Sequence, residues 1–537
     1  MKKLKGMIIT SSAPSASSSK AFHNTMTYLT ILPFLIPLSA TAVSVLLNRR
    51  WQVQAAWSMG ALLTAFGSSV LLLIQVINSG KPIVFQMGGW AAPFGISMVA
   101  DLLSATMAMM VLGVMLCGMI YVLGAKDSAV RYPSFMPLFL ALTTGLTGGM
   151  LTGDIFNLFV MVELIVISAA ALTAMSDDRY GAEAAYKYIY ISAIGTVTLL
   201  VGIGALYVSY GTLNMADLAQ RISANPDAPM LWVAIVFLFI TFMNKSAVFP
   251  MHFWQPDFHT VAPTPVSAML SSVVVKLGVY MFIRMTTLLF VPHAEAIRTM
   301  LLVAGVAGVI YGGLSALGTH DAKRMLAYST LAQIGFILIG IGWGTALSLA
   351  AAIIFTINHS LIKSALLMLV GYIASRAPIK TAAFNVIQGV GQVAPQAGVL
   401  FFLGMMALAG LPPTNGFVSK FALFQSGAQA QQWVWLAIIG VPSLFTLVYA
   451  GRAFMRIWWQ DLTHPDQRAA ILLSAGKNSA DVVWQTKPYG DNLLAPTILI
   501  SLCVGLGLFA EPMTRLALAT ANSILQPAQY VAAVLGK

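Results

Sequence analysis

Long apolar segments recur throughout this sequence and limit what it can fold into. Fourteen stretches of about 20 predominantly apolar residues follow one another along the 537-residue chain, and each could cross roughly 30 Å of hydrocarbon. Only 9% of the residues are charged and 58% are hydrophobic, whereas soluble domains carry about a quarter charged residues. These features exclude a soluble protein and predict an all-α polytopic membrane protein with about 14 transmembrane helices.

The remaining segments are short and polar or amphipathic. Residues 1–26 are basic and then rich in Ser and Ala, which predicts a disordered N-terminal extension. Residues 214–223 and 514–535 are amphipathic and predict surface helices, while 455–492 form a polar cytoplasmic loop that either docks a partner or is a solvated connection. The predicted spans lie near residues 27–48, 54–77, 97–124, 134–151, 154–175, 188–210, 230–250, 264–290, 299–318, 325–343, 346–373, 396–425, 432–454 and 493–511.

The composition gives little support for a bound cofactor or for nucleic-acid binding. The two cysteines, Cys117 and Cys503, both lie in apolar runs, so they predict neither a disulfide framework nor a metal or iron–sulfur site. Neither a phosphate-binding loop nor a dinucleotide fingerprint is present. The formal net charge of +12 is attributed to cytoplasmic loops rather than to nucleic-acid binding. We therefore expect no cofactor, no metal and no nucleic-acid partner.

Lysine and arginine residues predict the orientation of the helices. The loops after odd-numbered spans carry fifteen of them, including Lys323, whereas the opposite side carries ten, including Arg284. The side richer in Lys and Arg is expected to be cytoplasmic, which places both termini outside a bacterial cytoplasmic membrane.

Five charged side chains and one histidine lie deep inside predicted spans, where a charge costs about 2.5–3.5 kcal/mol on insertion scales. Snorkelling to the headgroups is an alternative for Lys245, five residues before Pro250, and a purely structural ion pair is an alternative for Glu163. Taken together, the set indicates an ion pathway. Its members are Glu163, Lys245, Lys276, His359, Lys363 and Lys420.

The chemistry of these groups suits protons. Desolvation favours the neutral form of a lysine and a nearby carboxylate favours the charged form, so a change in the separation of Glu163 and Lys245 would switch the lysine between holding and releasing a proton. His359 is expected to relay protons between lysines. Asp101 and Asp154 lie near span ends, where they are either helix caps or entry residues.

Two predicted spans contain helix breakers next to their lysines. Pro250 follows Lys245, while Pro412, Pro413 and Gly416 precede the lysine of the twelfth span. Interrupted helices at membrane depth line protein or water, and one in each half of the chain indicates an internal repeat. An odd number of spans per unit makes the two five-helix repeats inverted. The expected organisation is 27–133 for peripheral helices 1–3, 134–290 for the first repeat, 291–454 for the second, and 493–537 for helix 14 and a short amphipathic tail.

Four sequence blocks resemble a known family. FPMHFWQPDFHTVAPTPVSAMLSSVVVKLGVY, GTHDAKRMLAYSTLAQIG, NHSLIKSALLMLVG and LAGLPPTNGFVSKFALF are similar to signature blocks of the proton-conducting antiporter-like family. That family includes the antiporter-like subunits of respiratory complex I, the A and D subunits of Mrp-type sodium/proton antiporters, and subunits of membrane-bound hydrogenases. The resemblance covers about residues 97 to 430.

The resemblance implies a fourteen-helix core with two inverted repeats and broken seventh and twelfth helices. By this likeness Glu163 is the fifth-helix glutamate, Lys245 its seventh-helix partner, and Lys276 the eighth-helix lysine. His359 and Lys363 match the eleventh-helix relay, and Lys420 the terminal residue of the twelfth helix.

Three features point to one type of subunit within the family. The tail of about 26 residues after the last span is too short for the distal complex I subunit or the A-type Mrp subunit. Lys420 and the HFWQPDFH block agree with D-type subunits. The resemblance therefore implies a proton-translocating subunit of a multisubunit Na⁺/H⁺ antiporter that works with other membrane subunits. The alternatives are a pumping subunit of a complex I-type NADH:quinone oxidoreductase or hydrogenase, and a module that energises another uptake reaction such as inorganic carbon capture. The sequence leaves open which monovalent cation moves and whether this chain carries it.

Overall fold

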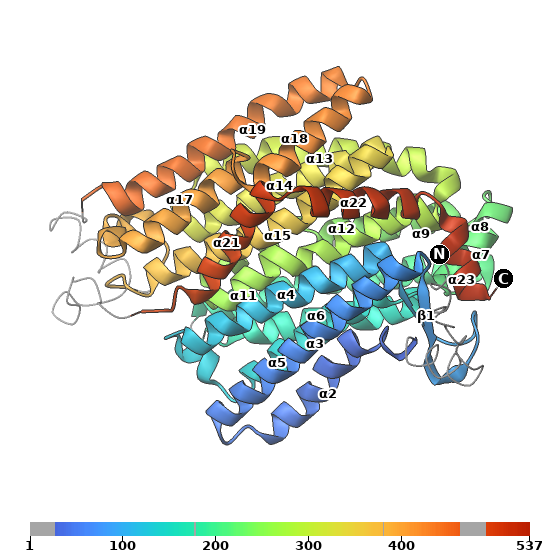
Figure 1. The fold of residues 1–537 in the computed structure, drawn as a ribbon, viewed down its shortest axis with the longest axis horizontal. Helices are drawn as coiled ribbons and strands as arrows, with labels where there is room; N and C mark the ends of the chain where they lie inside the picture. The colour runs from blue at the N-terminus through green and yellow to red at the C-terminus, as the bar shows by residue number, and fades with distance from the viewer. Residues whose placement is uncertain (1–26, 177–178, 380, 462–489, 537) are drawn as a thin grey trace, which may run out of the picture.

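The computed structural model describes residues 27–176, 179–379, 381–461 and 490–536. Within these ranges the chain is nearly all helical, and its helices run side by side in one bundle with a two-stranded antiparallel sheet at one end (Figure 1). The predicted extension 1–26 and most of the predicted loop 455–492 lie outside the described residues.

The first part of the bundle runs from α2 to η4. Its elements are α2 (Leu32–Leu46), α3 (Trp51–Ser79), β1 (Ile83–Gln86), β2 (Ser97–Ala100), α4 (Leu102–Gly124), α5 (Phe135–Leu151), α6 (Ile155–Ala174), α7 (Arg179–Tyr210), α8 (Met215–Ala224), α9 (Leu231–Lys245), α10 (Trp254–Val261), α11 (Thr264–Met269), the π-helical turn η3 (Leu270–Val274), α12 (Val275–Arg284) and a second π-helical turn, η4 (Met285–Leu289).

The second part completes the bundle. Its elements are α13 (Ala294–Gly318), α14 (Ala322–Trp343), α15 (Ala346–Ala374), α16 (Phe384–Ile387), α17 (Pro395–Ala409), α18 (Asn415–Gln429), α19 (Trp433–Phe454) with the π-helical turn η7 (Met455–Trp459), α21 (Leu494–Leu508), α22 (Glu511–Ile524) and α23 (Pro527–Leu535). Short 3₁₀ turns η1, η2, η5 and η6 occupy Met87–Gly89, Ser128–Arg131, Val291–His293 and Val390–Val393.

The expectation of an all-α membrane protein is confirmed. In the part of the chain that the structure describes, nine helices are long and apolar enough to cross a membrane, or ten if the bent pair α21–α22 is one span. Helices α2, α5, α9 and α17 are apolar but shorter. Each of the fourteen predicted spans overlaps a helix, while the number that cross the membrane stays a prediction.

The third predicted span is wrong at its beginning, because Ser97–Ala100 is not helical. This segment forms β2 and pairs with β1, Ile83 opposite Ala100. Asp101 then begins helix α4: its carboxylate accepts a hydrogen bond from the Ser104 backbone N–H at 2.8 Å, and the Ser104 hydroxyl accepts one from the Asp101 N–H at 2.9 Å. This capping box satisfies amide groups that the first helical turn leaves free, so it fixes the helix start at Leu102.

The tail also differs from the prediction. Residues 514–535 are not one surface helix, because α22 ends at Ile524 and a new helix begins at Pro527, whose ring cannot continue the preceding one. The chain also bends by 80° between α21 and α22. Helix α22 packs against α15 and α4, lying across the bundle in dark red (Figure 1). The predicted amphipathic helix at 214–223 is confirmed as α8.

The centre of the bundle consists of the segment α11–η4 together with α14 and α15. The most apolar window of each is 100%, 94% and 89% buried inside the protein, whereas the corresponding windows of α3, α7 and α13 are 39% buried. Polar side chains on the three central helices therefore contact other protein groups rather than lipid.

Two spans are interrupted. Helix α9 ends at Lys245 and α10 begins at Trp254, so Pro250 lies in a non-helical segment. Helix α17 ends at Ala409 and α18 begins at Asn415, with Pro412 and Pro413 between them.

Candidate functional site

A lysine and a histidine meet at the centre of the bundle. Lys276 on α12 and His359 on α15 are 0% and 1% exposed, and Nζ of the lysine lies 2.6 Å from Nδ1 of the histidine. Lys276 also donates to the Ser271 carbonyl at 3.1 Å. A contact this short allows a proton to pass directly between the lysine amine and the histidine ring.

The π-helical turn η3 precedes Lys276 and brings polar groups to its neighbours. Ser360 on α15 donates to the Ser272 carbonyl at 2.8 Å, and Ser364 donates to the Ser272 hydroxyl at 2.8 Å. The Ser271 hydroxyl lies 2.7 Å from that of Thr330 on α14. Such π-turns are frequent at functional sites, and this one ties the three central helices together around Lys276.

The four lysines of the predicted path share one kind of partner. In the part of the chain that the structure describes, none of them forms an ion pair, and each donates to a backbone carbonyl instead: Lys245 to Ser192 at 3.3 Å, Lys276 to Ser271 at 3.1 Å, Lys363 to Leu326 at 2.9 Å and Lys420 to Ala409 at 2.9 Å. A carbonyl oxygen compensates only part of the cost of burying an ammonium group. These sites therefore suit amines that take up and release protons.

Glu163 and Lys245 are neighbours but do not touch. Glu163 on α6 accepts a hydrogen bond from the Thr196 hydroxyl on α7, and Lys245 at the end of α9 donates to the Ser192 carbonyl one turn earlier on the same helix. Gly195 lets the helices approach, because a Cβ there would lie 2.8 Å from Nδ2 of Asn244. The predicted pair is thus joined through α7.

Lys420 lies directly against the second break. Besides the carbonyl of Ala409, the last residue of α17, its ammonium contacts the Ser443 hydroxyl on α19 at 3.1 Å. Gly416 lies in the first turn of α18 rather than in the break itself. An ideal Cβ on Gly416 would lie 1.7 Å from the Ala407 carbonyl oxygen, so a glycine is required for α18 to pass α17 this closely.

A small cavity separates His359 from Lys420. It has a volume of about 10 Å³, the space that one water molecule needs, and both side chains line it with Gln333, Asn358 and Ser419. Nε2 of His359 has no hydrogen-bond partner in the described structure. Asn358 donates to the Ser419 hydroxyl at 2.6 Å. Sequence reasoning missed this polar lining, although Asn358 directly precedes His359.

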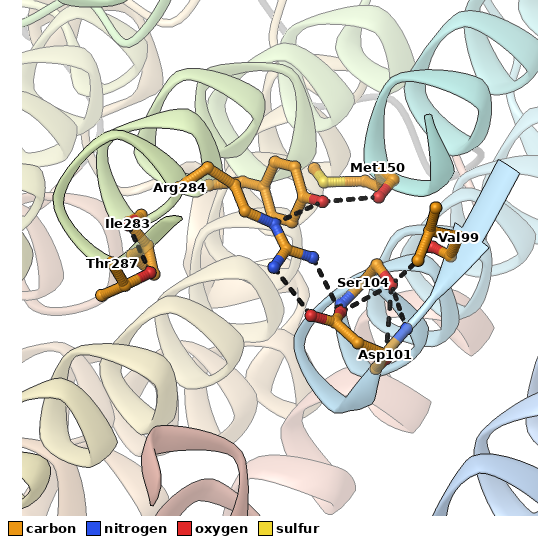
Figure 2. Close-up of polar contacts among 8 residues, drawn as sticks. Val99, Asp101, Ser104, Met150, Ile283, Arg284 and Thr287 are labelled. Atoms are coloured by element: carbon orange, nitrogen blue, oxygen red, sulfur yellow. Dashed lines mark hydrogen bonds and ion pairs between the residues drawn. The ribbon is translucent and has the colours of Figure 1, made fainter. Parts of the chain in front are cut away.

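A buried ion pair was also missed, because Arg284 was counted among the basic residues of one side of the membrane. Figure 2 shows its guanidinium forked onto Asp101, with both nitrogen–oxygen distances 2.7 Å, and Arg284 is 3% exposed. Its Nε donates to the Tyr280 hydroxyl at 3.0 Å, and that hydroxyl donates to the Met150 carbonyl at 2.8 Å. Asp101 is therefore both a helix cap and an ion-pair partner. The spacing of Lys276, Tyr280 and Arg284, four residues apart, places them on one helix face and could have indicated the burial.

Lys323 was assigned to a loop and is buried. It is 8% exposed and donates to the Ala262 carbonyl at 3.2 Å. His259 lies nearby, with Nδ1 2.9 Å from the Ser267 hydroxyl. Asp154, the other aspartate singled out by the sequence, caps α6 by accepting from the Asn157 N–H at 2.8 Å.

Metal-ligating side chains lie apart from one another in the described ranges, which contain no group of three or more His, Cys, Asp or Glu residues that could hold a metal ion. The described site consists instead of single protonatable groups: Lys276 and His359 are in direct contact, and His359 and Lys420 line one water-sized space. Such groups can take up and release protons one at a time.

Known proteins resemble this chain over most of its length. Residues 152–446, more than half of the chain, match the family described as NADH:quinone oxidoreductase/Mrp antiporter, TM. The D subunit of the Na(+)/H(+) antiporter of Alkalihalophilus pseudofirmus is 30% identical over 511 residues, which cover 95% of this chain and 100% of that protein. The N subunit of the NADH-quinone oxidoreductase of Desulforudis audaxviator is 32% identical over 494 residues, covering 90% and 96%. A chain of the Mrp complex from a Dietzia species superposes with a TM-score of 0.85 and 26% identity, covering 95% of this chain and 100% of that one.

Proposed function

Because the chain belongs to the NADH:quinone oxidoreductase/Mrp antiporter transmembrane family, we propose that it is the proton-translocating subunit of a multisubunit Na⁺/H⁺ antiporter. The observation that carries this proposal is the row of protonatable side chains through the buried centre of the bundle and both helix breaks. In order along the proposed path, these are Glu163, Lys245, Lys276, His359, Lys363 and Lys420.

The central step of the proposed path passes through Lys276 and His359. Their 2.6 Å contact supports direct transfer, and Lys363, one helical turn beyond His359, extends the row along α15. We assign one half-channel to each predicted repeat, 134–290 and 291–454, with these three residues between them.

The second half of the path leads from His359 to Lys420. His359 and Lys420 line the same water-sized cavity, and Nε2 of His359 has no hydrogen-bond partner in the described structure, so a single water there would carry a proton between the two residues. Lys420 is then the terminal group, next to the break where free backbone carbonyls occur.

The position of Glu163 supports a multisubunit assembly. Glu163 is half-buried and lies on the same face of α6 as Val160 and Ile167, which are 43% and 62% exposed. A carboxylate facing lipid is costly. A neighbouring membrane subunit that covers this face would remove the carboxylate from lipid.

Vesicle exchange tests the function. In inverted membrane vesicles containing the assembled complex, adding Na⁺ should dissipate a preformed pH gradient reported by a fluorescent dye. Lys245→Ala and Glu163→Ala should each abolish this exchange while the complex still assembles, and Lys81→Ala, at an exposed position after α3, should leave it intact. Normal exchange in either site variant would refute the assignment. A series of monovalent cations in the same assay identifies the ion.

A redox-driven complex is the second candidate, favoured by the 32% identity to the N subunit of an NADH-quinone oxidoreductase. In that case NADH, and not an imposed Na⁺ gradient, would drive proton movement that depends on Lys245. The same vesicles distinguish the two candidate functions, because NADH and the Na⁺ gradient are supplied in separate experiments.

We place the chain in the bacterial cytoplasmic membrane with both termini outside. The burial of Arg284 and Lys323 removes one basic residue from each side of the predicted topology and leaves the bias of the loops unchanged.

A further inference from the structure

We propose that Thr196 is a positioning residue whose hydroxyl group couples the charge of Glu163 to the proton held by Lys245. This inference rests on the proposed function, in which those two groups gate the first half of the path. Neither the family likeness nor the sequence singled out this threonine, which lies in the apolar run of α7.

The Thr196 hydroxyl and the Lys245 ammonium share one carbonyl acceptor. The Thr196 hydroxyl lies within hydrogen-bond distance of two acceptors, Oε1 of Glu163 and the Ser192 carbonyl, the latter at 3.1 Å. Nζ of Lys245 donates to the same Ser192 carbonyl at 3.3 Å. Glu163 and Lys245 thus communicate through a hydroxyl and a carbonyl one helical turn apart on α7.

A hydroxyl has a single hydrogen, so Thr196 serves one acceptor well at a time. When Glu163 is ionised, its carboxylate is the stronger acceptor and takes the hydrogen, because hydrogen bonds to charged groups are about twice as strong as neutral ones. The Ser192 carbonyl is then left to the Lys245 ammonium, which keeps its proton.

When Glu163 takes up a proton, its oxygen becomes a weaker acceptor. The Thr196 hydroxyl turns back to the Ser192 carbonyl and competes with Lys245 for that oxygen. The ammonium loses part of its compensation for burial, and proton release becomes easier. No covalent bond of Thr196 breaks. Its hydroxyl hydrogen changes hydrogen-bond acceptor, and the transferred proton leaves from Lys245.

The surrounding packing holds α7 and α9 at the separation that this coupling needs. Asn244, beside Lys245, donates to the Ile191 carbonyl at 2.8 Å, and Gly195 leaves room for it. The alternative for Thr196 is ordinary back-bonding to the preceding turn, which many helical threonines make. Thr198 is a matched control: it back-bonds to the Gly195 carbonyl at 2.8 Å and contacts the Thr241 hydroxyl, with no carboxylate partner.

The test compares Thr196→Val, which keeps the shape and removes the hydroxyl, with Thr196→Ser, which keeps the hydroxyl, and with Thr198→Val. Na⁺-driven exchange by the assembled complex is measured in vesicles across a pH series. Thr196→Val should lower the rate about tenfold, the loss expected for one hydrogen bond to a charged group. It should also move the acidic limb of the pH profile to higher pH, because the ionised carboxylate has lost a donor. Thr196→Ser and Thr198→Val should keep both the rate and the profile.

The inference is overturned if Thr196→Val matches the wild type, or if Thr196→Ser is as impaired as Thr196→Val, since packing would then explain the effect. Thr196→Ala replaces the valine variant if that complex does not assemble. Glu163→Ala and Lys245→Ala run alongside: exchange in either one refutes the proposed function itself, whereas their inactivity together with a normal Thr196→Val refutes the coupling alone.

Discussion

At the scale of single residues, the protein buries lysines against backbone carbonyls. Lys276 and Lys363 are 0% exposed. The Glu163 carboxylate could compensate the charge of Lys245, but it is held by Thr196, one helical turn from the carbonyl that Lys245 contacts. A close ion pair would stabilise the charged lysine and hold its proton. Partial compensation by a carbonyl keeps the charged and neutral forms closer in free energy, which suits a relay.

His359 provides the first residue-scale prediction. It contacts Lys276 through Nδ1 and lines a cavity that Lys420 also lines. Replacing it with alanine should lower Na⁺-driven exchange by about a hundredfold, in the range that losing a positioned acid–base group causes. Vesicle exchange normalised to the amount of assembled complex measures this. His293→Ala is the control, because that histidine contacts the Pro226 carbonyl and a tryptophan ring near the start of α13; an equal loss in both variants would contradict the prediction.

At the scale of elements, hydropathy was sufficient to predict the helices but not what joins them. Apolar composition over about 20 residues is a local property, so each predicted span overlaps a helix of the structure. The strand at Ser97–Ala100 depends on its pairing with β1, and the burial of Arg284 depends on Asp101, 183 residues away in the sequence. The close approach of α17 and α18 depends on how the chain turns between them. The sequence did not identify Thr196, because a single hydroxyl in an apolar run is usual in transmembrane helices.

The contact between α17 and α18 depends on one glycine. A Cβ at Gly416 would lie 1.7 Å from the Ala407 carbonyl oxygen, so Gly416→Ala must displace one helix of the broken span. Overpacking of this kind costs about 1–3 kcal/mol, and the thermal unfolding temperature of the purified complex should fall. Gly440→Ala on α19 meets no heavy atom within 4 Å and should leave that temperature unchanged or slightly higher. Equal temperatures for both variants would show that α17 and α18 do not pack this way.

The Asp101–Arg284 pair anchors the start of α4 to the end of α12. Removing one partner of a buried pair leaves an uncompensated charge and costs about 3–5 kcal/mol, so Asp101→Ala should markedly destabilise the folded chain. Glu511→Gln breaks an exposed pair with Arg515 and should cost less than about 1 kcal/mol. Combining Asp101→Ala with Arg284→Leu removes the buried charge and should recover part of the loss. Thermal unfolding of the assembled complex measures all three, and a double variant less stable than Asp101→Ala would contradict this explanation.

At the scale of the whole molecule, the bundle has two distinct ends. Helix α23 contacts α8 and β1 at one end, while α19 and η7 finish at the other (Figure 1). The excess of Lys and Arg in the predicted loops predicts that the second end is cytoplasmic. Sequence alone could state this bias but could not tell that Lys323 lies inside the protein, because burial is set by helices far apart along the chain.

Cysteine labelling tests this orientation. The native Cys117 and Cys503 are both buried, so a membrane-impermeant maleimide has a low background on the wild-type chain. Ala528→Cys, exposed on α23, should react in intact cells, and Gln460→Cys, exposed just after η7, should react only in inverted vesicles. The cationic loops stay with the cytoplasmic side because moving a charge outward works against the membrane potential, at about 2.3 kcal/mol per charge for 100 mV. The reverse labelling pattern would show that the molecule has the opposite orientation in the membrane, and the proposed half-channels would then exchange their cytoplasmic and external openings.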